Sequence, residues 1–109
     1  MKKELCLVLK SSDQTYATLE EIKSKGFNAT VVTTESLRHA VDYYPGDHHF
    51  FNLRQLENHE FLESVLCLFV VDDNKVKDLQ EVIRKSTNNF KDIKGFMYTR
   101  DILDYEGSI

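Results

Sequence analysis

The sequence predicts an α+β domain of the ferredoxin-like class, in the order strand, helix, strand, strand, helix, strand. Two short runs, Leu5–Leu9 and Val65–Val71, are wholly apolar and end at charged or turn-forming residues, which is typical of strands buried on both faces. Each run is followed by a segment with helical hydrophobic periodicity, and two β-branched segments complete the order. We therefore expect a four-stranded antiparallel sheet, two helices on one face, and a long insertion between the second and third strands.

The first half of the chain begins with a strand expected at residues 4–10. A helix follows, which Ser12 or Asp13 can cap and which Gly26 ends. Residues 27–34, FNATVVTT, alternate only in part and indicate a strand at the sheet edge. Three apolar residues at helical spacing are expected to turn the helix toward the sheet: Tyr16, Leu19 and Ile22.

The second half repeats this plan after the insertion. Asp73 or Asn74 is expected to cap the second helix, and residues 95–99, GFMYT, form the last strand. The two wholly apolar strands should occupy the sheet centre, with the other two at its edges. The inward stripe of the second helix is expected to be Val76, Leu79, Val82 and Ile83.

The second face of this sheet needs a cover, because two helices can bury only one face while the central strands are apolar on both. Either the middle segment folds back over the second face or the chain self-associates. We favour self-association, since an exposed apolar face of that size is rare on a monomer.

Composition narrows the class of protein. The chain has 109 residues, which suits one domain spanning 1–109, and its net charge of −4 gives no general attraction to nucleic acid or anionic membranes. The apolar run near the N-terminus is too short for a signal peptide or a membrane span, so we expect a cytoplasmic protein. Cys6 and Cys67 each lie in a strand-like run without metal-binding spacing, and are expected to be reduced and buried.

From residue 66 onward the chain resembles a known family. LCLFVVDDNKVKDLQEVIRKSTNNFKDIKGFMY is similar to the C-terminal half of the PII signal-transduction proteins, which are trimers of ferredoxin-like subunits. In that family the second helix leads into a phosphate-holding loop of the form T-G-x-x-G-D-G-K. Thr87, Asp92 and Lys94 match this pattern without a gap. Its glycines are replaced, in order, by Asn88, Lys91 and Ile93, so the resemblance is to a divergent PII-like protein without the glycine-rich phosphate loop.

The resemblance implies a function. A PII-like homotrimer would bind a small anionic ligand, with an adenine nucleotide as candidate, in clefts between subunits, and would signal to an unknown protein partner through the loop at residues 34–60. Lys94 would be the phosphate partner and Thr87 a hydroxyl donor. The resemblance places the ligand-binding residues at Thr33, Thr34, Thr87, Asn88, Asn89 and Lys94.

The middle segment contains the run DYYPGDHHFF, residues 42–51, in which Pro45 and Gly46 form a turn. Adjacent histidines on an extended chain point to opposite sides and lack the spacing of a metal site, so we expect no metal there. The aromatic side chains either pack locally or anchor a ligand or a partner. The expected contact residues of the loop are Tyr43, Tyr44, His48, His49 and Phe50.

Two other functions stay open. One is a metal-binding trimer resembling the copper-tolerance proteins, using the histidines. The other is a ligand-free protein-interaction module. Asp72 and Asp73 precede a helix and are expected to cap it instead of acting as an acid/base pair, and no hydrolase, kinase or redox motif is present, so we expect neither an enzyme nor a cofactor.

Overall fold

The computed structural model describes residues 1–37, 41 and 64–108. Their elements are β1 (Lys2–Lys10), α1 (Asp13–Ser24), β2 (Thr30–Thr34), β3 (Ser64–Asp72), the short 3-10 helix η2 (Asp73–Lys75), α4 (Val76–Thr87) and β4 (Gly95–Asp101). The strands form one sheet in the order β2-β3-β1-β4, with every neighbouring pair antiparallel. The predicted ferredoxin-like α+β class is confirmed, and the two wholly apolar strands lie at the centre.

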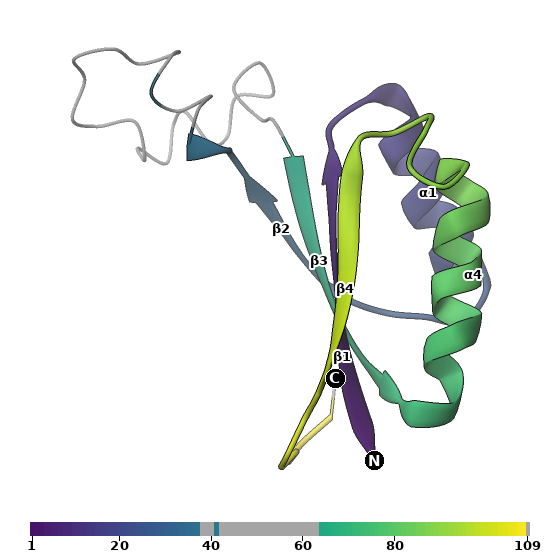
Figure 1. Cartoon of the computed structure of the whole chain (residues 1–109), viewed down its shortest axis with the longest axis vertical. Helices are drawn as coiled ribbons and strands as arrows, with labels where there is room; N and C mark the ends of the chain where they lie inside the picture. Colours follow the sequence, from purple (N-terminus) through teal and green to yellow (C-terminus); the bar gives the residue numbers. More distant parts are fainter. Residues whose placement is uncertain (38–40, 42–63, 109) are drawn as a thin grey trace.

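Both helices cover the same face of the sheet (Figure 1). The core forms where the two helices pack against the alternate residues of β1 and β3 that point toward the helices. Leu5, Leu7 and Leu9 of β1 are fully buried, and each contributes about 1.5–3 kcal/mol by leaving water. The partners that complete this core are Ile22, Cys67, Phe69, Val71, Val76, Leu79, Ile83 and Ile93.

The inward face of α1 differs from the prediction. Ser12 caps the helix by accepting from the Gln14 N–H at 3.3 Å, as expected. The Thr15 hydroxyl donates to the Lys10 carbonyl at 2.8 Å, which draws Thr15 toward the sheet. Because successive helical residues are about 100° apart, Tyr16 is turned outward and is 72% exposed. The expected inward position of Tyr16 was wrong, and the buried residues of α1 are Thr15, Thr18 and Ile22.

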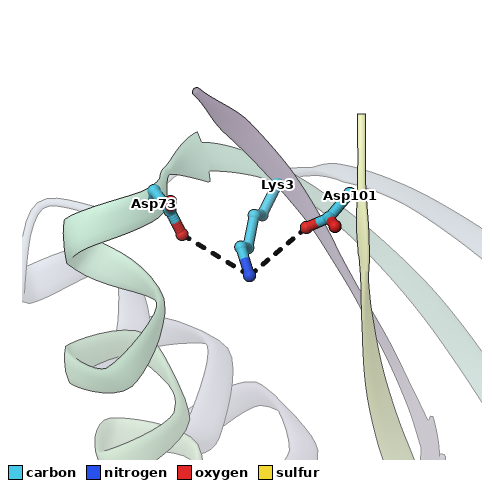
Figure 2. A network of polar contacts seen from close by, with 3 residues as sticks. All are labelled: Lys3, Asp73 and Asp101. Atoms are coloured by element: carbon cyan, nitrogen blue, oxygen red, sulfur yellow. Dashed lines mark ion pairs between the residues drawn. The ribbon is translucent and has the colours of Figure 1, made fainter. Parts of the chain in front are cut away.

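The start of α4 also differs from the prediction. The inward stripe is confirmed, but η2 precedes the helix and neither it nor α4 has a side-chain cap. The two expected capping aspartates make ion pairs instead: Asp72 with Lys2 at 2.9 Å and Asp73 with Lys3 at 3.5 Å. Lys3 also reaches Asp101 of β4 at 3.3 Å, so its ammonium lies between two carboxylates (Figure 2).

The bounds of the edge strands follow from pairing. β4 extends two residues past the predicted end because Arg100 and Asp101 pair with Glu4 and Lys3 of β1, where opposite charges face each other. β2 starts at Thr30, three residues later than predicted. Across the described ranges, we find no helix that is both long and apolar enough to cross a membrane.

Candidate functional site

The sheet face turned away from the helices, here called the open face, is apolar at its centre and polar or charged at its two ends. Register places alternate residues of the four strands on it. The aromatic rings of Phe96 and Tyr98 stack there with centroids 6.4 Å apart, and the two residues are 55% and 46% exposed. The other apolar residues of the open face are Cys6, Val8, Val32, Leu66, Leu68 and Val70. The central strands are thus apolar on both faces, as the sequence predicted.

A pocket of about 450 Å³ lies at the end of the open face where β3 begins. Two lysines from different strands meet at its wall, because the Lys10 N–H donates to the Lys94 carbonyl at 2.8 Å and extends the pairing of β1 with β4. The Thr34 and Ser64 hydroxyls, 2.5 Å apart, join the end of β2 to the start of β3. The described residues that line it are Val8, Lys10, Thr34, Glu35, Ser36, Ser64, Lys94, Gly95 and Phe96.

Gly95 allows β4 to approach β1 closely at this pocket. A Cβ atom at residue 95 would lie 2.1 Å from the Val8 carbonyl oxygen and 3.0 Å from a methyl group of Leu9. The carbonyl belongs to the backbone of a central strand and cannot move aside cheaply. The absence of a side chain at residue 95 therefore holds Lys94 and Phe96 next to β1.

The predicted ligand residues fall into separate places. Thr34 and Lys94 line the pocket together. Thr33 pairs with Val65, which packs against the core, so Thr33 lies on the helix side of the sheet. Five of the described lining residues belong neither to the predicted ligand residues nor to the expected loop at 34–60, and sequence reasoning missed them: Val8, Lys10, Ser64, Gly95 and Phe96. Lys10 lies two residues after Val8, so both side chains point to the same face of β1, and this spacing could have placed Lys10 on the open face.

Thr87 is buried, and its hydroxyl is engaged inside the protein. It donates to the Ile83 carbonyl at 2.8 Å and accepts from the Phe90 N–H at 3.1 Å. Asn88 and Asn89 lie on a different depression, beside α4, together with Glu81, Arg84 and Lys85. The structure therefore does not bring these three predicted ligand residues to the pocket of Thr34 and Lys94.

The loop after α4 uses its own backbone donors. Asn88, Asn89 and Phe90 have φ angles of 53°, 56° and 62°, in the left-handed region. Each backbone N–H from Asn88 to Asp92 donates to an acceptor in this loop or in α4. Ile93, in place of the third family glycine, is 3% exposed and belongs to the core. In this conformation the loop has no cluster of free N–H groups between residues 88 and 92 for a phosphate.

The expected loop contacts Tyr43, Tyr44, His48, His49 and Phe50 lie outside the described residues, as do His39 and His59. Within the described part, no group of three histidine, cysteine or acidic side chains is placed to hold a metal ion. Cys6 and Cys67 are free, buried thiols, as predicted. Burial raises the pKa of the Cys67 thiol to about 11, so it is neutral near pH 7.

Comparisons with known proteins support the fold. No family model and no curated protein matches the chain. A functionally unknown protein from Pediococcus pentosaceus ATCC 25745 matches with a TM-score of 0.61 and 9% identity, covering 99% of each chain. A structure of CPII from Thiomonas intermedia K12, bound to ADP, AMP and acetate, matches with a TM-score of 0.58 and 19% identity, covering 93% of this chain and 85% of that one. The predicted PII-like fold is confirmed.

Proposed function

We propose that this PII-like chain is a cytoplasmic regulatory protein that binds a small anionic ligand in the pocket of Lys10 and Lys94. The backbone bond between these residues is the observation that carries the proposal, because it holds two ammonium-bearing side chains at one wall. Among the described residues of the lining, Glu35 is the one acidic residue, so their formal charge is +1. A lysine ammonium is a mobile donor well suited to phosphate or carboxylate oxygens.

An adenine nucleotide is the first ligand to test. Val8 and Phe96 give the pocket an apolar wall, on which the flat face of a base can pack. Thr34 and Ser64 offer hydroxyls for ribose or phosphate oxygens. The CPII structure with ADP, AMP and acetate supports this choice, since that protein shares the fold and binds ligands of this class.

The proposed assembly is a homotrimer in which the open faces of the subunits meet. The pocket lies at one end of that face, so a neighbouring subunit would complete it as an inter-subunit cleft. The exposed aromatic side chains at residues 96 and 98 support this arrangement, because aromatic residues are enriched in the buried part of protein interfaces.

The proposed output is a change in contacts with a partner protein, made by residues 34–60. Thr34 and Ser64 line the pocket and stand at the two ends of the chain segment that joins β2 to β3. A ligand bound between them would contact both ends at once and favour one arrangement of the contacts at Tyr43, Tyr44, His48, His49 and Phe50. We propose a regulatory role and no catalytic one.

A thermal-shift screen with ATP, ADP, AMP and cyclic dinucleotides, with and without Mg²⁺, tests the proposal. A ligand present at 100 times its Kd stabilises the folded state by about 2.7 kcal/mol, which corresponds to a rise in Tm of several degrees. The expected result is such a rise with at least one nucleotide, reduced in Lys94→Ala and in Lys10→Ala.

Lys91→Ala is the matched control, because Lys91 carries the same charge three residues before Lys94 but does not line the pocket. It should retain the wild-type rise. No rise with any nucleotide would refute nucleotide binding. An equal loss in Lys91→Ala and Lys94→Ala would show that overall charge is responsible and the pocket is not.

A further inference from the structure

The strand β3 continues past the point where its edge partner β2 begins. The first residue of β2 lies opposite Leu68, and β3 runs on from there to its end without this partner. On the other side of β3, the Asp73 N–H donates to the Met1 carbonyl at 2.9 Å. Backbone groups alternate between the two sides of an antiparallel strand, so those of Val70 and Asp72 point away from β1, toward the side that β2 leaves open.

These edge groups have no partner within the described part of the chain. Neither the N–H nor the C=O of Val70, nor the N–H of Asp72, forms a hydrogen bond with another described residue. In the register of β2 and β3, Asn28 is the residue opposite Val70, but its side-chain oxygen accepts from the Ala29 N–H at 2.9 Å. A local bond of this kind competes with strand pairing, so the edge of β3 is left free here.

A pocket of about 500 Å³ opens onto this free edge, and both Val70 and Asp72 line it. Its volume is within the range of sites for small ligands. The other walls are the turn after α1, the start of α4 and the C-terminal tail, which contributes Tyr105, Gly107 and Ser108. The tail is held there by two contacts with the first strand: the Ile102 N–H donates to the Lys2 carbonyl at 3.3 Å, and the Lys2 ammonium lies 5.5 Å from the centre of the Tyr105 ring.

The charged side chains of this pocket favour a ligand that carries a carboxylate. The described lining has a formal charge of +1 from Lys2, Lys25, Lys75, Asp72 and Asp78. Lys2 and Asp72 neutralise each other at 2.9 Å. Lys25 lies 3.7 Å from Glu21 in an exposed pair, which contributes little, and Lys75 forms no ion pair with a described carboxylate. Only Asp78 opposes these two ammonium groups, because the acidic residues of the tail at positions 104 and 106 do not line the pocket.

We propose that the free edge of β3 and this pocket form a second binding site, which takes an acidic, extended peptide segment of a partner protein. The main chain of the peptide pairs with Val70 and Asp72 as an added strand, and a carboxylate side chain contacts Lys25 or Lys75. The two edge positions span about 7 Å, which matches about three residues of a strand. The site lies at the opposite end of the sheet from the pocket of Lys10 and Lys94, so the inference is independent of the proposed ligand.

A peptide is the occupant that the edge selects. The free groups at Val70 and Asp72 include both donors and an acceptor, arranged at the spacing of a strand, and another main chain supplies the complementary groups at the same spacing. A metal ion or a phosphate group satisfies only one of these two kinds of group. The lysines then distinguish an acidic peptide from a neutral one.

An NMR titration of the full chain tests the site. The probe is a capped pentapeptide of alternating valine and glutamate, and the control peptide has glutamine in place of glutamate. The glutamate peptide should shift the amide signals of Val70 and Asp72 and slow the hydrogen exchange of both amides. The control peptide should bind about two- to fivefold more weakly, which is the effect of an exposed charge pair.

Two N-methylated forms of the glutamate peptide test the main-chain pairing. One is methylated on its valine nitrogens and the other on its glutamate nitrogens, so in any one register only one form has methyl groups facing β3. That form should bind at least about tenfold more weakly than the other, because it loses hydrogen bonds to the edge. Equal affinity of the two forms would refute the added strand.

Substitutions at the lysines test the charge recognition. The double variant Lys25→Gln/Lys75→Gln should bind the glutamate peptide about tenfold more weakly than the wild type. Lys77→Gln is the matched control, because Lys77 is an exposed lysine of α4 that does not line the pocket, and it should stay within about twofold of the wild type.

Three further results would overturn the proposal. The first is that millimolar peptide leaves the amide signals of Val70 and Asp72 unchanged. The second is that the peptide shifts only signals around Lys10 and Lys94, which would place it in the other pocket. The third is a loss in Lys77→Gln equal to that in the double variant, which would show that overall charge is responsible.

Discussion

Replacing Thr87 by valine is expected to lower the free energy of unfolding by about 1–2 kcal/mol without weakening ligand binding. Valine keeps the branched shape but removes the hydroxyl that links the Ile83 carbonyl to the Phe90 N–H. A net hydrogen bond is worth about 1 kcal/mol, and a buried donor left without a partner costs about 1–3 kcal/mol. Phe90 is only partly buried, so water can reach its freed N–H in part, and the lower end of that range applies.

Urea unfolding followed by circular dichroism measures this loss. All variants are compared at one protein concentration, because self-association makes the apparent stability depend on it. Thr99→Val makes the same chemical change at an exposed position of β4 and should alter the free energy of unfolding by less than about 0.5 kcal/mol. The Kd of the ligand found by thermal shift is then measured for Thr87→Val.

Two results would contradict this reasoning. The first is a change in Thr87→Val no larger than that in Thr99→Val, which would mean that the hydroxyl contributes nothing to the loop. The second is unchanged stability with a weakened ligand affinity, which would make Thr87 the hydroxyl donor that the family resemblance implied.

Three further predictions concern other described residues. Gly95→Ala should lower the free energy of unfolding by about 2–3 kcal/mol, since its Cβ would meet the Val8 carbonyl at 2.1 Å; a thermal melt like that of the wild type would contradict the close approach. Burial raises the pKa of Cys67 from 9.0 to about 11, so between these values the unfolded thiol releases a proton that the native thiol keeps. Stability should therefore fall as pH rises through this window, and iodoacetamide at pH 8 should modify Cys67 only after unfolding; rapid labelling of the native chain would argue against burial. The Lys2 ammonium lowers the pKa of Asp72 below 3.8. The ionised Asp72 side chain therefore adds to the free energy of unfolding above pH 3.8, and this stabilisation is lost as pH falls through the lower, native pKa. The difference in stability between wild type and Asp72→Asn should accordingly disappear in acid, and a difference that persists at pH 2 would show a cause other than charge.

The fold was predictable because its strongest signals are local. Leu5–Leu9 and Val65–Val71 are apolar without interruption, and only a central strand buried on both faces accommodates such short runs. Their placement at the sheet centre then determined which segments lie at the edges. The family resemblance agreed with this order, and it also located Thr34 and Lys94, which the structure brings to one pocket.

The details at element ends were less predictable, because alternative partners compete there. Asp73 was a reasonable helix cap by sequence, but in the folded chain its carboxylate forms an ion pair with Lys3 at 3.5 Å. Tyr16 fits an apolar helical stripe, but the contact between Thr15 and the Lys10 carbonyl sets the rotation of α1. In both cases the outcome was decided by a contact with a residue of another element, the strand β1.

The sequence by itself determined the order of the elements, the central strands and the apolar character of both sheet faces, since these depend on residue type and spacing. Only the tertiary structure decided which polar groups share a site. Lys10 and Lys94 are 84 positions apart and meet through one backbone bond between β1 and β4, while Thr87, which the family pattern places beside Lys94, turns into the core. The reason is that strand register and burial depend on contacts between segments distant in the sequence, and the local sequence pattern specifies neither.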